Sequence, residues 1–227
     1  MATCDRPHLL PITLECFKRQ TLPRCELIVI DDGANYPANA SLVEAVGGRL
    51  IYTPPGTPLG EKLNIALDHS TGSIICKWDD DDWYAPAFLE RMHSAIIATQ
   101  RRVLAFVQPF LFFRLAEWDL RRSDPDRCSG ATLTIHRDLL ERCRFRPIPR
   151  EVDGYLMLDV MADGVGLHPV ATDDFIQLRH SKHIWNHMPD GESVSAYLER
   201  AELYSGLPEE LLPSWAVEAY RRAAKWT

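Results

Sequence analysis

The sequence lacks the run of roughly 18 apolar residues that a membrane-spanning helix needs. Its longest apolar stretch, VLAFVQPFLFF, is interrupted by Gln108 and Pro109, and no hydrophobic leader opens the chain. Basic residues are fewer than acidic ones: the sequence has 25 Lys and Arg and 32 Asp and Glu, which gives a net charge of −7. Non-specific binding to nucleic acid requires a basic surface. We therefore expect a cytoplasmic protein with no strong nucleic-acid signal and, at most, a peripheral contact with the inner face of a membrane.

Paired cysteines and phosphate-binding loops are missing as well. The six cysteines are scattered without a CxxC pair, which argues against a zinc site and a disulfide framework. Neither GxxxxGK[ST] nor GxGxxG occurs, so no P-loop or dinucleotide fingerprint supplies a phosphate cradle. The chain has no internal repeat and no low-complexity linker, and its 227 residues suit one large domain or two small ones.

What the sequence has in excess is a run of acids. Residues 77–86 read KWDDDDWYAP, so four aspartates directly follow the apolar run SIIC. Carboxylates roughly 4 Å apart repel by about 1 kcal/mol in water and about 4 kcal/mol near a protein surface, so water or a cation must offset the repulsion. A solvated loop is the ordinary interpretation of a charge run. The strand-like start, the enclosing aromatic residues and the following Pro86 favour a strand-to-helix loop that holds a divalent cation. An EF-hand is excluded, because its sixth position needs glycine and would be Tyr84 here.

A second acidic pair, Asp31 and Asp32, ends the apolar run ELIVI and is followed by Gly33. Asp and Gly favour turns for local reasons, so a simple strand-ending turn is one interpretation. The first half of the chain alternates strand and helix signals, which predicts an α/β fold with a mostly parallel sheet covered by helices. A parallel sheet brings this acidic strand end close to the four aspartates. The pattern suggests a nucleotide ribose and base at one strand end and a metal-bound diphosphate at the other.

Apolar spacing predicts the individual elements. We expect helices around residues 10–17, 59–69, 86–100, 137–143, 193–204 and 208–226. We expect strands around residues 26–30, 49–54, 73–78, 104–113, 131–136 and 175–180.

Several segments, taken in order, resemble the motifs of family 2 glycosyltransferases with the GT-A fold. In roughly the first 90 residues these are MATCDRP, ELIVIDDG, LGEKLNIAL and GSIICKWDDDDWYAP. Further on, SGATLTIHRDLLERCRF, EVDGYLML and LRHSKHIW are similar to the acceptor-side segment, the catalytic acid pair and a late metal-binding histidine. The resemblance implies a Rossmann-type GT-A-like domain over residues 1–190, with a nucleotide-binding half (1–100) and an acceptor half (101–190). Residues 191–227 would form a C-terminal helical extension.

The resemblance also implies an activity and the residues that carry it. A metal-dependent, inverting glycosyltransferase would move a sugar from a nucleotide-diphosphate sugar, with a UDP-sugar as first choice, to a hydroxyl of a saccharide, lipid-linked or other acceptor. Mn²⁺ or Mg²⁺ would be the cofactor. Asp153 would be the catalytic base, and Asp81 and His180 would hold the metal. The donor would contact Thr3, Asp5, Asp32, Lys62, Asp79 and Asp80.

The residues by themselves leave alternatives open. His180 could be purely structural, Asp153 could cap a helix, and Lys62 could lie exposed on a helix. Two rival classes also remain. A sugar-phosphate nucleotidyltransferase would use a nucleotide and Mg²⁺ too, although its triphosphate loop is missing; the other rival is a catalytically inactive nucleotide-sugar-binding module.

Two surface features remain to be placed. Four arginines between residues 142 and 150 could meet an anionic acceptor or lipid headgroups, but a solvated basic face is the simpler expectation. The C-terminal helices could dock on the domain, join two subunits into a homodimer or touch a membrane surface. Docking is our expectation.

Overall fold

The computed structural model describes residues 1–99, 102–180 and 193–226. Its first sheet is parallel, in the spatial order β1-β2-β3, and consists of β1 (Ala2–Thr3), β2 (Leu27–Asp31) and β3 (Gly48–Tyr52). All five residues of β2 are buried, as a strand covered on both faces requires. The strand predicted from ELIVI is therefore confirmed.

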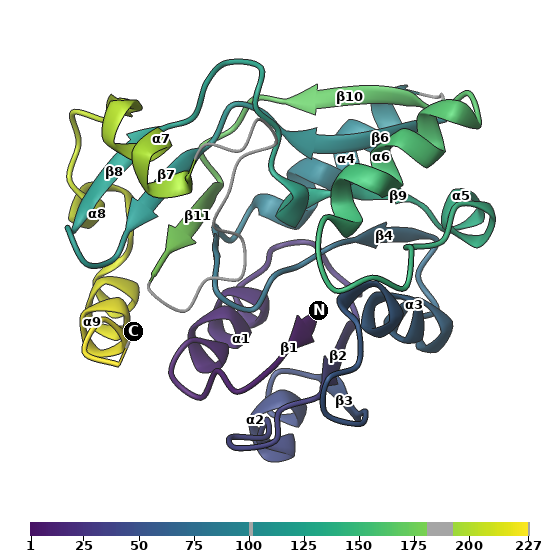
Figure 1. Cartoon of the computed structure of the whole chain (residues 1–227), viewed down its shortest axis with the longest axis horizontal. Helices are drawn as coiled ribbons and strands as arrows, with labels where there is room; N and C mark the ends of the chain where they lie inside the picture. The colour runs from purple at the N-terminus through teal and green to yellow at the C-terminus, as the bar shows by residue number, and fades with distance from the viewer. Residues whose placement is uncertain (100–101, 181–192, 227) are drawn as a thin grey trace.

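Helices flank the strands throughout the described chain (Figure 1). They are α1 (Leu10–Lys18), α2 (Ala40–Glu44), α3 (Leu59–His69), α4 (Phe88–Thr99), α5 (Arg137–Arg142) and α6 (Val152–Ala162). α1 carries Pro11 in its first turn, where a missing amide donor costs nothing, and its apolar positions face inward. α3 has the bounds that the apolar spacing predicts and buries Leu63 and Leu67.

A second sheet has the order β10-β6-β9-β4. Its strands are β4 (Ile74–Cys76), β6 (Val103–Val107), β9 (Thr134–His136) and β10 (Gly166–Val170). β10 runs parallel to β6, whereas β9 is antiparallel to both β6 and β4. The predicted α/β fold with helices covering the sheets is confirmed, and the second half adds antiparallel pairs.

A third sheet has the order β12-β8-β7-β11-β5 and carries the C-terminal helices (Figure 1). Its strands are β5 (Trp83–Tyr84), β7 (Leu111–Arg114), β8 (Asp119–Arg122), β11 (Phe175–Arg179) and β12 (Glu202–Leu203). β5 pairs with the first residues of β11, so the end of the acidic run is joined to a strand about ninety residues later in the chain.

The C-terminal region differs from the two long helices that its sequence predicts. It contains α7 (Val194–Arg200), α8 (Pro208–Leu211) and α9 (Ser214–Ala223), separated by β12 and by Pro213. The apolar face of α9 packs on the body, where Tyr220 is fully buried and Trp215 contacts the ring of Trp83. The expected docking is confirmed for these helices, and the homodimer stays a prediction.

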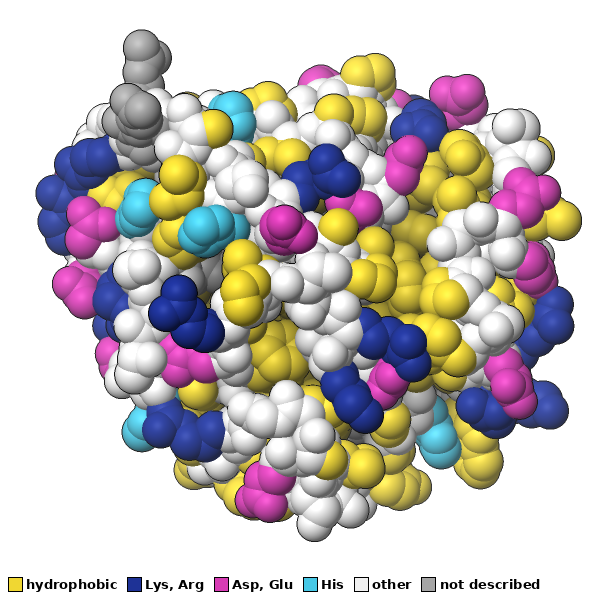
Figure 2. All heavy atoms as spheres, turned by 180° about the vertical axis from the view of Figure 1, so that it is seen from behind, with side chains coloured by type: hydrophobic (Ala, Val, Ile, Leu, Met, Phe, Trp, Pro, Cys, Tyr) yellow, Lys and Arg dark blue, Asp and Glu magenta, His cyan; other side chains and the backbone are white. Residues whose placement is uncertain are grey.

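Charged side chains of both signs are interspersed on the face shown in Figure 2, around a hydrophobic hollow. Three of the four arginines between residues 142 and 150 likewise form ion pairs with acidic side chains. Arg142 pairs with Asp163, Arg144 with Asp68 and Arg146 with Asp159. Their charge is largely balanced by neighbouring acids, which favours the solvated-face interpretation. No helix in the described ranges is both long and apolar enough to span a bilayer.

Candidate functional site

The four aspartates form a buried turn between β4 and β5. Asp80 and Asp81 are each 6% exposed and Asp82 is 1% exposed, whereas the side chain of Asp79 is partly open at 34%. A solvated acidic loop would leave most of these carboxylates in water. That interpretation is therefore wrong, and burial on this scale requires compensating partners.

Aromatic and hydroxyl groups hold the backbone of this turn. The ring of Trp78 stacks on that of Tyr84 with centroids 3.8 Å apart, and Trp78 Nε1 donates to Thr13 Oγ1 at 2.7 Å. The amide of Asp79 donates to the hydroxyl of Tyr84 at 2.8 Å. The amide of Leu178 in β11 donates to Asp82 Oδ1 at 2.9 Å. Strands from both halves of the chain thus fix where the carboxylates lie.

Two buried cations lie against the acids, and the sequence analysis assigned a role to neither. Arg6, in the loop after β1, contacts Asp81 Oδ2 and lies 3.1 Å from Asp80 Oδ1. Lys77 lies 2.7 Å from Asp79 Oδ1 and its side chain is 3% exposed. A lysine inside an apolar strand, directly before four acids, was the local signal for the second cation. Nothing local marks Arg6, because its partners are about 75 residues away in the chain.

The second acidic strand end lies beside the first, as expected, although β2 and β4 belong to different sheets and not to one parallel sheet. Asp32 is 6% exposed, and Lys62 Nζ lies 2.5 Å from its Oδ1 and 3.2 Å from the carbonyl oxygen of Thr3. Thr3 in turn hydrogen-bonds through its side chain to Asp80. Lys62 is 6% exposed, so its interpretation as an exposed helix residue is wrong. The structure brings four of the six predicted donor residues together here.

Asp31 and Asp5 organise the chain around this edge. Asp31 Oδ1 accepts from the amide of Gly33 at 2.9 Å, so this residue is also the turn-former that its sequence suggests. Asp5 accepts from the amides of Asn35 and Tyr36 at 2.8 and 2.6 Å, and these contacts lower the pKa of its carboxyl. The carboxylate of Asp5 thus holds the following loop, and its predicted donor contact stays a prediction.

His180 reaches the acids from the end of β11. Its Nε2 lies 3.1 Å from Asp81 Oδ2, across a separation of 99 residues, and its side chain is 1% exposed. These are the two residues predicted to hold the metal. Burial raises the pKa of Asp80 to about 6 against the lowering effect of Arg6, and it raises the pKa of Asp82 well above its ordinary value. The cluster therefore carries unfavourable negative charge, which a further cation would relieve.

Asp153 lies in the first turn of α6, facing the other side of Lys77. The helix cap is Glu151, which has φ 60°, so the interpretation of Asp153 as an N-cap is wrong. Asp153 Oδ2 lies 3.4 Å from Lys77 Nζ, and its Oδ1 has no hydrogen-bond partner among the described residues. Burial raises the pKa of Asp153 to about 6 despite Lys77. Gly130 packs directly on this side chain, because a Cβ at Gly130 would lie 2.5 Å from Oδ2.

The sequence profile described as "Glycosyl transferase family 2" matches residues 1–163. The chain belongs to this family. The family resemblance expected from the ordered motifs is thereby confirmed. No curated protein matches the chain.

Several solved structures share the fold of this chain. TarS 1–349 of S. aureus, in complex with UDP-GlcNAc, has a TM-score of 0.64 at 13% identity, covering 80% of this chain and 58% of that one. The mannosyltransferase PcManGT from Pyrobaculum calidifontis, in complex with GDP-Man and Mn²⁺, has a TM-score of 0.57 at 18% identity, covering 78% and 55%. A mycobacterial protein has a TM-score of 0.61 at 17% identity, covering 81% and 67%. The chain spans only 36% of another TarS chain. Sequence identities this low show a common fold alone.

The acids of the family 2 chain have the right donor chemistry for a hard divalent cation. Carboxylate oxygens suit Mg²⁺ and Mn²⁺, and Mg²⁺ usually takes only one or two protein carboxylates together with substrate phosphates. Within the described ranges no three acidic or histidine side chains are already arranged as a metal centre. However, the buried oxygens Asp80 Oδ2 and Asp82 Oδ2 have no partner among the described residues. The residues present therefore have the donor chemistry to fit such a cation.

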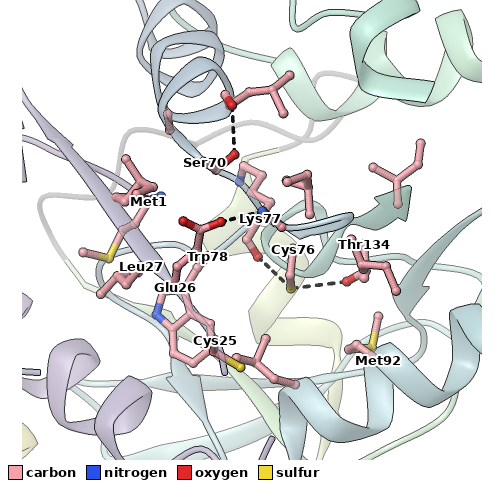
Figure 3. Close-up of a pocket in the computed structure, with 18 of the residues that line it drawn as sticks. Met1, Cys25, Glu26, Leu27, Ser70, Cys76, Lys77, Trp78, Met92 and Thr134 are labelled. Carbon is pink, nitrogen blue, oxygen red and sulfur yellow. Dashed lines mark hydrogen bonds between the residues drawn. The ribbon is translucent and has the colours of Figure 1, made fainter. Parts of the chain in front are cut away.

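A cavity of about 490 Å³ lies between the segments around β2 and β4 of the family 2 chain. Figure 3 shows Leu27 on one wall and Cys76 on the other. The carboxylate of Glu26 at this cavity accepts from the amides of Thr71 and Gly72, so it is committed to a turn. None of the four aspartates lines the cavity, but Lys77 and Trp78 do, so the cavity borders the acidic turn and shares these two residues with it.

Proposed function

We propose that this chain transfers a sugar from a nucleotide-diphosphate sugar to an acceptor hydroxyl, with a divalent cation and with inversion at the anomeric carbon. The observation that carries the proposal is the contact of His180 with Asp81, 3.1 Å between Nε2 and Oδ2. The fold brings these two residues together across 99 residues of sequence, at the edge where Asp32 and Asp153 also lie. Such a convergence of acids and a histidine suits a metal–diphosphate site.

The donor would bind along the edge formed by the ends of β1, β2 and β4. Thr3 and Asp32 would contact the nucleoside, and Asp79 and Asp80 would lie nearer the ribose and diphosphate. Lys62 neutralises Asp32 in the unliganded protein. A UDP-sugar is our first choice, and a GDP-sugar is the second, because TarS and PcManGT were solved with one of each.

Asp81 and His180 would hold Mn²⁺ or Mg²⁺ together with oxygens of the diphosphate. A bound divalent cation would stabilise the negative charge that develops on the leaving diphosphate. The chain's own part is to hold these ligands in a turn from which water is largely excluded, since Trp78 and Tyr84 pack beneath it. Electrostatic attraction is stronger in such a low-dielectric environment.

Asp153 would accept the proton of the attacking hydroxyl. A base works best when its pKa lies near the working pH, and burial raises the pKa of Asp153 to about 6. The second oxygen of the carboxylate, Oδ1, is buried and has no hydrogen-bond partner among the described residues, so the proton of an entering acceptor hydroxyl would satisfy it. The acceptor oxygen, deprotonated by this base, would attack the anomeric carbon in line while the nucleoside diphosphate leaves from the opposite side, and such a single displacement gives inversion. The acceptor hydroxyl itself, whether saccharide or lipid-linked, stays a prediction.

Thermal unfolding with nucleoside diphosphates tests the proposal. UDP, GDP, ADP and TDP are compared with and without Mn²⁺, for the native chain and for Asp81→Ala and Asp153→Asn. A ligand at 100 times its Kd stabilises by about 2.7 kcal/mol, or roughly 5–10 °C for this size of chain. We expect one nucleotide to give a Mn²⁺-dependent shift that Asp81→Ala abolishes and Asp153→Asn retains.

Transfer is then measured with the matching nucleotide sugar, by release of the nucleoside diphosphate. Asp153→Asn should lower turnover by about 10²–10⁴-fold with unchanged donor binding. The proposal fails if no nucleotide shifts the unfolding temperature. A nucleotide shift without any turnover in the native chain would instead indicate a binding module.

A further inference from the structure

The guanidinium of Arg6 contacts the same carboxylate oxygen as the proposed metal ligand His180. Arg6 Nη1 contacts Asp81 Oδ2, and His180 Nε2 lies 3.1 Å from that atom. Arg6 Nη1 also lies 3.1 Å from Asp80 Oδ1. The side chains of the three charged residues are nearly buried, at 14% exposure for Arg6, 8% for Asp80 and 7% for Asp81. A permanent positive charge therefore already sits at the position that the proposed metal ion needs.

A divalent cation and this guanidinium cannot both lie against Asp81 Oδ2. Two positive groups a few ångströms apart repel strongly when little water separates them. Arginine cannot lose its charge at any ordinary pH. Burial lowers the pKa of the Arg6 guanidinium, but the negative charges of Asp80 and Asp81 outweigh that effect and raise its pKa above the ordinary value. The guanidinium must therefore move away from Asp81 before a metal ion can bind there.

The loop is built so that the side chain can move while the backbone stays in place. The carbonyl oxygen of Arg6 accepts from the amides of Leu9 and Leu10 at 3.3 and 3.1 Å, at the start of α1. The preceding Asp5 is fixed by its hydrogen bonds to the loop after β2. Reorientation of Arg6 therefore needs only side-chain rotation, and α1 keeps its hydrogen bonds.

We propose that Arg6 is a resident cation, which neutralises Asp80 and Asp81 in the empty site and leaves Asp81 when a divalent cation binds with the donor. This inference rests on the proposed function. The displaced guanidinium would pair with the donor diphosphate, because arginine binds phosphate oxygens in a bidentate manner. Metal and nucleotide would then bind cooperatively, since the metal alone has to displace Arg6 without giving it a new anionic partner.

Direct Mn²⁺ binding tests this displacement without relying on turnover. The signal of free Mn²⁺ in electron paramagnetic resonance gives its Kd for the full chain, with and without the nucleoside diphosphate that the unfolding panel selects. The variants are Arg6→Gln and Arg6→Lys. The matched control is Arg91→Gln, because Arg91 pairs with Asp174 on the surface, away from the acidic cluster.

Without nucleotide, Arg6→Gln should bind Mn²⁺ at least tenfold more tightly than the native chain, because the competing charge is gone. Arg6→Lys should retain weak binding, and Arg91→Gln should match the native chain. The tightening of Mn²⁺ binding by nucleotide should be smaller in Arg6→Gln. Tightened binding should disappear again in the double variant Arg6→Gln/Asp81→Ala, which places the ion at the acidic cluster.

An equal or weaker Mn²⁺ affinity in folded Arg6→Gln would overturn the inference and make Arg6 a structural ion-pair residue. If Arg6→Gln does not fold, the same comparison is made with Arg6→Ala, in which an equal or weaker Mn²⁺ affinity has the same force. These outcomes leave the proposed function standing as long as the native chain shows Mn²⁺-dependent nucleotide binding. A native chain that binds nucleotide equally well in EDTA overturns both.

Discussion

Replacing Lys77 with methionine should raise the pKa of Asp153 and move the acid limb of activity to higher pH. Lys77 Nζ lies 3.4 Å from Asp153 Oδ2. Burial raises the pKa of Asp153 to about 6, and the ammonium charge of Lys77 works against that rise. Once the ammonium group is removed, nothing from Lys77 opposes the rise in the pKa of Asp153 that burial causes. The ionised form of Asp153, which is the form that accepts a proton, then becomes harder to reach at neutral pH.

The distance sets the size of the effect. Unit charges 3.4 Å apart attract by about 5 kcal/mol at an effective dielectric constant near 20 and by about 1 kcal/mol in water. The side chain of Asp153 is 29% exposed, so water screens its attraction to Lys77, and the value near about 1 kcal/mol applies. One pKa unit corresponds to about 1.4 kcal/mol. We therefore expect the pKa of Asp153 to rise from about 6 to about 7 in Lys77→Met.

Two measurements check this shift. One is the pH profile of kcat/KM for release of nucleoside diphosphate, in which the loss should be largest below pH 7 and largely recovered near about pH 9. The other is a ¹³C NMR titration of the Asp153 carboxyl, assigned with Asp153→Asn. Lys77→Arg keeps the charge and serves as control. Removing one partner of a buried ion pair costs about 3–5 kcal/mol, so folding is verified by circular dichroism. An acid limb that stays in place or moves to lower pH in folded Lys77→Met would refute the assigned role of Lys77.

Two further predictions concern stability. A Cβ at Gly60 would lie 1.8 Å from the carbonyl oxygen of Arg146, so Gly60→Ala should cost about 1–3 kcal/mol. The control is Gly154→Ala in α6, where a Cβ would meet nothing within 4 Å, so this variant should be neutral or stabilising. Equal unfolding temperatures of Gly60→Ala and Gly154→Ala would contradict the packing argument. Burial raises the pKa of Asp82 in the folded chain. Above about pH 4 the unfolded chain releases the proton of this carboxyl while the folded chain retains it. The free energy of unfolding therefore falls as the pH rises above that value. Asp82→Asn, which can still accept from Leu178, should therefore raise the free energy of unfolding at pH 7 but not at pH 4, and a gain independent of pH would count against it.

The sequence was informative wherever structure depends on local pattern. The apolar spacing of LGEKLNIALDH predicts α3 with its observed bounds, and ELIVI predicts the buried strand β2. Both elements are set by periodicity within a few residues. The acids at 31–32 and 79–82 were also predicted to lie together at the ends of two strands. They do, but their strands β2 and β4 belong to different sheets.

Two of the elements that sequence analysis missed depend on distant partners. β5 has two residues inside an acidic turn, and only its pairing with Phe175 and Ile176 makes it a strand. Residues 202–203 continue a helical pattern but form β12, because they pair with Arg121 and Arg122 of β8. Local propensity cannot show such pairings, and tertiary contacts override it.

The site follows the same division between local and distant information. The residue types of the acidic run could be read from the sequence, and the family motifs added His180 and Asp153. The burial of Lys62 against Asp32 could not be predicted from the sequence, because an exposed helical lysine has the same local pattern. The partners of Arg6 were hidden for the same reason, since they are identified only when the first loop folds over β4.

Charge balance explains why these hidden cations are needed. The described site places five carboxyl groups, Asp79–Asp82 and Asp153, near three permanent cations. Arg6 and Lys77 form ion pairs with these acids, and the charge of Arg179 interacts with Asp81 and Asp82. An excess of negative charge is what attracts a divalent ion, but without any cation the empty protein would have to bury unpaired carboxylates, at a cost of several kcal/mol for each ion. Lys77 is held by acids on both sides and lies on the β4 side of the turn, whereas Arg6 contacts the oxygen assigned to the metal. A chain that must be stable when empty and must also receive a metal–diphosphate needs one cation that stays and one that can leave.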